Sequence, residues 1–166
     1  PYTVVQKPFT AAELAFWGKS GIGENILKAY RTVSLKKFSS ENQERKPFSC
    51  MTSVDEPMFG YMGKQHIKVY RPCSQMRFLY AGDFGDNYCF GLEQLPATGD
   101  TLFITGGEKD VLSLAAHGFP AICFGSETAR IPHRLIEELS QRFRNIVLLY
   151  DMDATGKKPA IALQQE

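Results

Sequence analysis

Two aspartates, Asp151 and Asp153, follow an apolar run with one residue between them. The run, residues 146–150, has no charged residue, which is typical of a strand buried on both faces of a parallel sheet. Alternate residues of a strand point the same way, so both carboxylates could converge on one site at the end of the sheet where α/β proteins hold ligands. A hard cation such as Mg²⁺ (or Mn²⁺) is the usual reason to place two carboxylates so close together. A solvated turn at the end of a strand is the alternative interpretation.

A second acidic segment lies upstream, where the apolar residues 102–105 lead into Gly106-Gly107 and then into Glu108 and Asp110. Glycines at a turn from a strand into a helix allow a phosphate to approach the backbone closely, and the following helix N-terminus favours anions. Lysines flank both acidic segments, and two of them are candidate phosphate contacts, although such lysines are often merely solvated: Lys109 and Lys157.

The elements that must position these residues alternate along the chain. Apolar runs predict strands and amphipathic runs predict helices, in the order strand 102–105, helix 109–117, strand 121–124, helix 132–143, strand 146–150. This β-α-β-α-β order indicates a parallel sheet with flanking helices. Because the first and third strands both end in acidic residues, we expect one acidic site at the carboxyl edge of the sheet.

Residues 100–166 resemble the TOPRIM domain of DnaG-type primases, topoisomerases and some nucleases. Asp151, Asp153 and Gly156 match its Asp-x-Asp-x-x-Gly motif, and Gly107 and Asp110 match part of its Glu-Gly-x-x-Asp motif. The resemblance implies a Mg²⁺ (or Mn²⁺) site formed by Asp110, Asp151 and Asp153. It also implies catalytic roles for these aspartates and structural turns at the matching glycines.

The sequence departs from the family at one position. Gly106 stands where TOPRIM enzymes carry the glutamate that serves as a metal ligand or a general acid/base. Glu108, two residues downstream, is the candidate replacement and is included among the predicted catalytic residues. The departure leaves open whether the catalytic chemistry is intact.

The segments before residue 100 are similar to the primase half of phage and plasmid primase–helicases. Residues 10–38 predict two short helices around a Gly-Ile-Gly turn, the first with a capping box formed by Thr10 and Glu13. Residues 58–92 predict short strands separated by turn residues. In the family this β-rich segment is basic and faces the template. The matching residues here, which could instead belong to an ordinary solvated sheet face, are Lys64, Lys68, Arg71 and Arg77.

These segments predict three parts: a helical segment and linker (1–57), a small β-rich basic subdomain (58–99) and a C-terminally incomplete TOPRIM domain (100–166). The fold class we expect is therefore α/β, with a TOPRIM-like parallel sheet and flanking helices preceded by a small α+β subdomain. The polar stretch 39–57 is predicted to be a loop or linker. We also expect the sequence to be an excerpt of a larger protein.

Composition narrows the function classes. The 166 residues are 43% hydrophobic and carry a formal net charge of +1, so any contact with nucleic acid must come from a local basic patch. The four cysteines lack the paired spacing of a zinc ribbon, and free thiols suit a reducing, cytoplasmic location. No apolar run reaches membrane length, so no membrane partner is expected.

Three functions remain compatible with the sequence. The first is a DNA primase core that makes RNA primers on single-stranded DNA from nucleoside triphosphates, working with a replicative helicase in the same or another chain. The second is a catalytically impaired TOPRIM module that binds DNA or acts as a scaffold in a replication or mobile-element protein. The third is a TOPRIM nuclease or a topoisomerase fragment, which the primase-like N-terminal segments disfavour.

Overall fold

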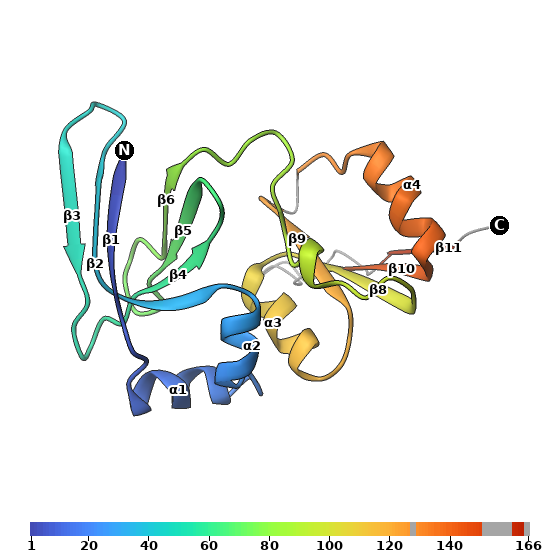
Figure 1. Cartoon of the computed structure of the whole chain (residues 1–166), viewed down its shortest axis with the longest axis horizontal. Helices are drawn as coiled ribbons and strands as arrows, with labels where there is room; N and C mark the ends of the chain where they lie inside the picture. The colour runs from blue at the N-terminus through green and yellow to red at the C-terminus, as the bar shows by residue number, and fades with distance from the viewer. Residues whose placement is uncertain (127–128, 151–160, 165–166) are drawn as a thin grey trace. The chain divides into compact units, whose positions relative to one another are not determined.

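The computed structural model describes residues 1–126 and 129–150 in full and the backbone of residues 161–164. The chain divides into two compact units, Pro1–Gly85 and Asp86–Glu166 (Figure 1). The three parts expected from the sequence, with boundaries at residues 57 and 99, stay a prediction. Each unit is described by itself below.

The first unit is an antiparallel sheet with two short helices. Its described elements are β1 (Tyr2–Lys7), α1 (Ala11–Gly18), α2 (Glu24–Ala29), β2 (Thr32–Glu41), β3 (Pro47–Met51), β4 (Phe59–Met62), β5 (His66–Tyr70) and β6 (Phe78–Gly82). The strand order is β1-β2-β4-β5-β6, and β3 pairs with β2 beyond the point where β4 ends its pairing with β2. The strand β6 therefore lies at an edge of this sheet.

The predicted linker at residues 39–57 is wrong in its first part, because β2 extends to Glu41 and forms a hairpin with β3. The hairpin turn is held by the Asn42 side chain, whose Oδ1 accepts hydrogen bonds from the backbone N–H groups of Glu44 and Lys46 at 3.0 and 2.9 Å. The part of β2 after Phe38 is polar and most of β3 is exposed, so the sequence lacks the apolar alternation by which half-buried strands are recognised. Pairing with a long neighbouring strand stabilises them instead.

Two apolar layers cover the two faces of this sheet. On one face, Trp17 of α1 packs edge-on against Phe59 at 5.0 Å and against Tyr70 at 6.1 Å between ring centroids. The opposite face carries a second cluster of buried residues: Leu35, Phe38, Met58, Ile67, Val69 and Ala81. The predicted pair of helices and the capping box of Thr10 and Glu13 are confirmed, although the helical region ends at Ala29 and β2 begins at Thr32.

The second unit contains the predicted parallel strands. Its described elements are β7 (Cys89–Phe90), the 3-10 helix η1 (Leu92–Gln94), β8 (Gly99–Thr105), α3 (Glu108–Ala116), β9 (Ala121–Phe124), α4 (His133–Arg142), β10 (Phe143–Leu149) and β11 (Ile161–Gln164). The order is β11-β10-β8-β9-β7, with β8 parallel to both β9 and β10. The three predicted parallel strands and both predicted helices are confirmed. The edge strand β7 lies within residues 58–92, where short strands were predicted, but its antiparallel pairing with β9 and the edge strand β11 were not predicted.

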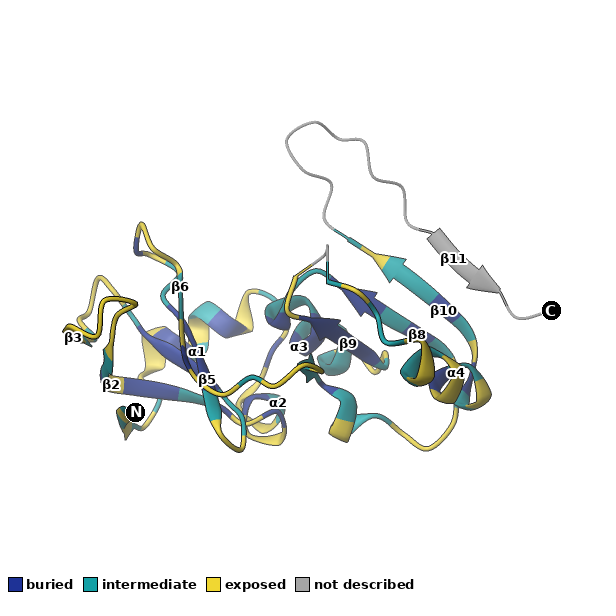
Figure 2. Cartoon of the chain, turned by 90° about the horizontal axis from the view of Figure 1, so that it is seen from above, coloured by how far each residue is buried: buried dark blue, intermediate teal, exposed yellow. Residues whose placement is uncertain are grey.

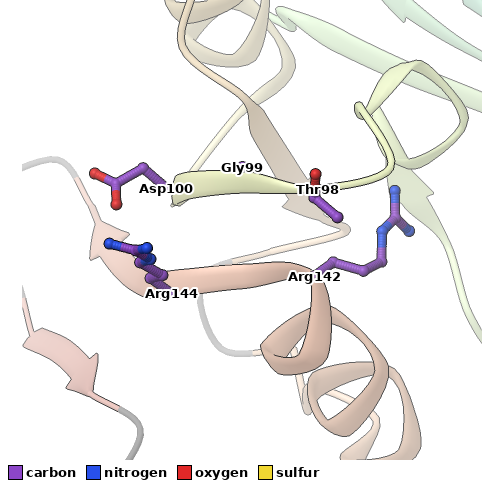
Figure 3. A pocket seen from close by; sticks show the side chains of 5 residues that line it. All are labelled: Thr98, Gly99, Asp100, Arg142 and Arg144. Carbon is purple, nitrogen blue, oxygen red and sulfur yellow. The ribbon is translucent and has the colours of Figure 1, made fainter.

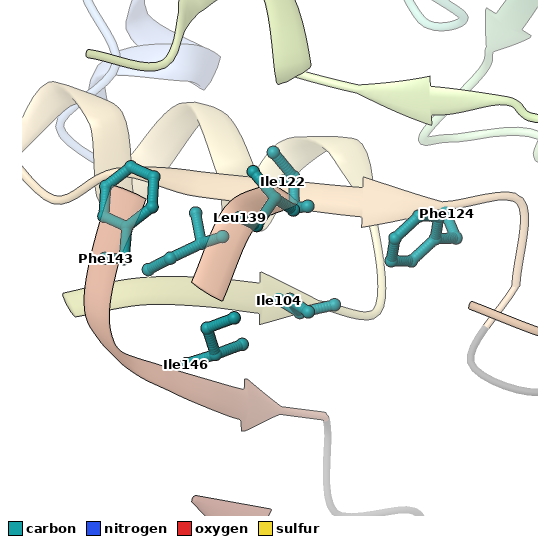
Figure 4. Packing of buried hydrophobic residues seen from close by; sticks show 7 residues of the cluster. Ile104, Ile122, Phe124, Leu139, Phe143 and Ile146 are labelled. Atoms are coloured by element: carbon teal, nitrogen blue, oxygen red, sulfur yellow. The ribbon is translucent and has the colours of Figure 1, made fainter. Parts of the chain in front are cut away.

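Alternate strand residues form the core beneath α4. Leu102 and Ile104 of β8 and Ile122 of β9 belong to one buried cluster (Figure 4). Leu139 of α4 and Phe143 at the start of β10 complete its centre. The intervening strand residues point to the other face of the sheet, on which α3 packs against β8 and β9. All four residues of β9 are buried, so this strand is covered on both faces (Figure 2).

Among the described residues, no helix is long and apolar enough to cross a membrane.

Candidate functional site

The topology of the parallel sheet singles out the carboxyl end of β8. The chain leaves β8, forms β9 on one side through α3, and then returns through α4 to form β10 on the other side. Ligands of open α/β sheets bind at such a switch point, where neighbouring connections diverge. The residues that follow β8 here are Gly106, Gly107 and the first turn of α3, which is where the sequence analysis placed the acidic site.

The turn between β8 and α3 is open. Gly107 is the N-cap of α3, with an extended backbone (φ −160°), and a Cβ added to it would meet no atom within 4 Å. The turn is held by a hydrogen bond of 2.9 Å from the Thr105 hydroxyl to the Gly107 carbonyl. The space beside the helix N-terminus is thus compatible with close approach of an anionic group.

The two acidic residues of this first turn occupy different environments. Asp110 is half-buried, whereas Glu108 is only 2% exposed. The Glu108 carboxylate accepts a hydrogen bond of 3.0 Å from the Tyr88 hydroxyl. Tyr88 directly precedes β7, and its ring lies beside Gly125 just after β9. The strand order places β9 and β7 on the opposite side of β8 from β10. The hydrogen-bonded Glu108 carboxylate is therefore tied to the β9 side of the sheet.

Several predicted site residues lie outside the described part of the chain: Asp151, Asp153, Gly156 and Lys157. The chain that leads to them is described as far as Tyr150, one residue beyond β10, and the Cα of Leu149 is level with that of Thr105 in the parallel register. The carboxyl ends of β8 and β10 are thus adjacent. Within the described ranges, no group of three or more His, Cys, Asp or Glu side chains could hold a metal ion. The predicted metal site stays a prediction.

The predicted basic residues of the first unit do not form one cluster. Lys64 is exposed in the turn before β5, and Arg77 is exposed just before β6. Lys68 is only 7% exposed, with its ammonium 4.5 Å from the Phe78 ring centroid. Arg71 lies near Cys50. Burial raises the pKa of the Cys50 thiol, and the positive charge of Arg71 partly offsets that rise. Cys50 packs against the sheet face opposite to Lys68.

Sequence reasoning missed two aromatic residues of interest, Tyr88 and Tyr80. The partner of Tyr88 is 20 positions away in the sequence, and no local pattern connects them. Tyr80 alternates with Phe78 along β6, which does indicate a shared face, but alternation does not say which ring is covered.

A shallow open depression of about 420 Å³ lies at the opposite edge of the parallel sheet, at the amino ends of β8 and β10 (Figure 3). Its lining residues are Thr98, Gly99, Asp100, Arg142 and Arg144. The Arg142 guanidinium donates hydrogen bonds to the carbonyls of Ala97 (3.0 Å) and Pro96 (2.7 Å), which fastens the loop before β8 to the end of α4. This depression is therefore separate from the predicted site, and Arg142, one of its two arginines, has a structural role.

The described cysteines are free thiols. Burial raises the pKa of the Cys89 thiol to about 12, so this thiol is protonated at neutral pH. A neutral thiol is a poor nucleophile and a poor metal ligand.

No protein-family model matches the chain, and no curated protein matches it. Solved structures, in contrast, match the chain. One is the primase fragment of the bacteriophage T7 primase–helicase, with 19% identity and a TM-score of 0.54 over 84% of this chain and 55% of that chain. The chain has a primase-like fold. A second is a structure of T7 lagging-strand DNA polymerase interacting with primase domains bound to an RNA/DNA hybrid and dTTP (19% identity, TM-score 0.54, 82% of this chain and 58% of that chain). The chain thus spans a little over half the length of these structures.

Proposed function

We propose that this chain is the core of a DNA primase that synthesises RNA primers on single-stranded DNA by metal-assisted nucleotidyl transfer. The observation that carries the proposal is the primase-like fold over 84% of the chain, which includes an antiparallel unit and a parallel sheet. Acidic residues follow two adjacent parallel strands, β8 and β10, in the sequence. The partners we propose are single-stranded DNA, nucleoside triphosphates and a replicative helicase in the same or another chain.

The proposed ligands at the β8 turn are carboxylates, which suit a hard divalent cation. The half-buried Asp110 supplies carboxylate oxygens in the first turn of α3, and Asp151 and Asp153 are the proposed companions from the chain after β10. When bound, Mg²⁺ or Mn²⁺ would neutralise charge on the reacting phosphate oxygens. The open turn at Gly107 and the N-terminus of α3 would orient the triphosphate, and Lys109 and Lys157 are proposed phosphate contacts.

A TOPRIM module with impaired catalysis is the second candidate, and two observations favour it. Gly106 offers no carboxylate at the position of the family's glutamate. Glu108, the candidate replacement, is buried and hydrogen-bonded to Tyr88 on the β9 side of the sheet. A displacement of about 1 Å can cost 10²-fold in rate, so Glu108 is a poor substitute. Such a module would keep a role in DNA binding or scaffolding.

Template-directed synthesis separates the two functions. The full protein is incubated with single-stranded DNA, labelled ribonucleotides and Mg²⁺ or Mn²⁺, and oligoribonucleotide products are resolved by length. A primase yields products that Asp151→Asn and Asp153→Asn reduce by at least about 10²-fold. Absence of products from the unaltered protein, together with products from Gly106→Glu, establishes the impaired module. Products that survive both aspartate substitutions contradict the proposed site.

A further inference from the structure

Tyr80 has 57% of its surface accessible, which makes it the most exposed aromatic residue in the described first unit. It lies on β6, an edge strand of the antiparallel sheet, directly opposite Lys68 of β5. Single exposed aromatics are common on protein surfaces and need no explanation by themselves. The neighbours of Tyr80 distinguish it from that ordinary case.

The Tyr80 ring is held by packed groups. The ammonium of Lys68, itself buried, lies 5.5 Å from the Tyr80 ring centroid. Phe84 contacts Tyr80 edge-on at 5.7 Å, and Phe84 in turn stacks on His66 at 4.3 Å and 29° between ring planes. An aromatic ring fixed in this way loses little conformational entropy when a ligand stacks on it.

Cations lie at both ends of this aromatic edge. Arg77 precedes β6 and is exposed, with its guanidinium 5.6 Å from the Phe78 ring centroid. Lys64 is exposed in the turn that precedes β5, at the other end of the β5–β6 pair. At the same end as Lys64, the Asp83 carboxylate accepts a hydrogen bond of 2.8 Å from the Gly85 N–H, within the turn that follows β6.

We infer that Tyr80, with Phe84 beside it, is a base-stacking platform for single-stranded nucleic acid, with Arg77 contacting the backbone phosphate next to the stacked base. Sequence-tolerant single-strand binding combines an aromatic face for the base with a cation for the phosphate, and this edge presents both. In this arrangement Lys68 supports the ring from beneath and does not contact a phosphate. The inference deepens the proposed function, on which it rests for the identity of the strand as a template.

The test separates base stacking from phosphate attraction. Binding of the full chain is measured by fluorescence anisotropy to a labelled oligo(dT) and to an abasic oligonucleotide of equal length, which keeps the phosphates and lacks the bases. Tyr80→Ala is expected to weaken oligo(dT) binding at least about fivefold, the lower end of one stacked base, and to leave abasic binding unchanged. Arg77→Ala is expected to weaken both.

Matched variants guard against a change in folding. Tyr80→Phe keeps the aromatic face and should bind oligo(dT) as the unaltered chain does, whereas Tyr80→Leu keeps apolar bulk without that face and should lose as much as Tyr80→Ala. Phe119→Ala removes an exposed aromatic residue of the second unit and should have no effect. Binding to a labelled oligo(rU) shows whether the platform accepts RNA as well as DNA. If oligo(rU) binds, Tyr80→Ala should weaken that binding too, because stacking does not depend on the sugar.

The outcomes for this inference and for the proposed function are distinct. Equal oligo(dT) affinity of Tyr80→Ala and the unaltered chain overturns the stacking platform, even if primers are synthesised. Loss of oligo(dT) binding in Tyr80→Ala and Tyr80→Leu supports the platform even if the chain makes no primers, in which case the proposed catalysis fails alone. Equal losses on the oligo(dT) and abasic strands also overturn it, because the ring would then act without bases.

Discussion

The two carboxylates in the first turn of α3 have acquired different surroundings although they are two positions apart. Glu108 is buried under the Tyr88 hydroxyl, whereas Asp110 is half-buried. Burial of a polar group is costly unless hydrogen bonds compensate for the lost hydration, and the Tyr88 hydroxyl supplies one such hydrogen bond to Glu108. Glu108 thus links the start of α3 to the segment before β7, and we assign it an anchoring role.

Replacing Tyr88 by phenylalanine tests this anchoring role. Tyr88→Phe removes the donor of the 3.0 Å hydrogen bond to Glu108 and should lower the free energy of unfolding by ~1–3 kcal/mol, the range for a buried group that loses its hydrogen-bond partner. Denaturant unfolding at neutral pH measures it. Tyr80→Phe is the matched control, since Tyr80 is largely exposed, and should stay within about 0.5 kcal/mol of the unaltered chain.

Glu108→Gln completes that test. A glutamine can still accept the Tyr88 hydrogen bond, so it should destabilise the chain less than Tyr88→Phe does, and it should leave any primer synthesis within about tenfold. A loss of synthesis of 10²-fold or more, with stability retained, would instead make Glu108 a catalytic residue.

The sequence located the acidic residues at the end of β8 because a strand-to-helix turn has a local signature of apolar run, glycines and amphipathic helix. It could not distinguish Glu108 from Asp110, because the partner of Glu108 comes from a segment with no periodic relation to α3. Lys68 is a similar case. Its alternation with Tyr70 indicates a shared face, yet only the packing shows that Phe78 and Tyr80 cover its ammonium.

At the scale of elements, one buried carboxylate of α1 contacts both β1 and β2, in addition to the pairing of these two strands. Glu13 of α1 is 7% exposed; its Oε1 lies 2.7 Å from the Lys7 ammonium of β1 and accepts a 2.8 Å hydrogen bond from the Ser34 hydroxyl of β2. Burial by itself raises the pKa of Glu13. The hydrogen bonds from Lys7, the Thr10 N–H and Ser34 outweigh burial, and the net pKa lies below its ordinary value.

This network predicts an acid-sensitive contribution to stability. Because the folded pKa of Glu13 is below the unfolded one, the contribution is complete above the ordinary value of 4.5 and is lost as pH falls through the folded pKa. Denaturant unfolding between about pH 7 and pH 3 should therefore show a steeper loss of stability in the unaltered chain than in Glu13→Gln. At neutral pH Glu13→Gln should cost ~1–3 kcal/mol.

Glu24→Gln is the matched control, since Glu24 of α2 forms an exposed pair with Lys28 at 3.7 Å. Exposed pairs contribute little, so this variant should follow the pH profile of the unaltered chain. Identical pH profiles of Glu13→Gln and Glu24→Gln would show that the buried network does not carry the acid sensitivity.

The capping box in this network was predictable because Thr10 and Glu13 are three positions apart, the spacing that a helix N-terminus requires. The contribution of Lys7 and Ser34 was not, because each depends on where β1 and β2 pass the helix. The same contrast holds for the strands. Long apolar runs revealed β8, β9 and β10, whereas β1 and β3 are stabilised by pairing with β2, and their sequences show no strong pattern.

At the scale of the whole molecule, charge is almost balanced, with a net charge of +1. Such a chain has no general attraction for a polyanion, so affinity for nucleic acid must come from particular positions. Lys64 and Arg77 are the exposed members of the predicted basic set, at opposite ends of the β5–β6 pair. The expected footprint on the phosphate backbone is therefore small.

Salt dependence measures that footprint. Each phosphate contact on a single strand contributes about 0.7 to the slope of log affinity against log salt concentration, so Lys64→Ala with Arg77→Ala should make the slope shallower by roughly 1.4. The control double variant, Lys28→Ala with Lys46→Ala, removes two exposed lysines of the same unit that pair with Glu24 and Glu44. Both double variants change the net charge from +1 to −1, since each removes two positive charges. A shallower slope only in the first locates the phosphate contacts at the β5–β6 edge, whereas equal changes in both would mean that overall charge governs binding and that no local patch exists.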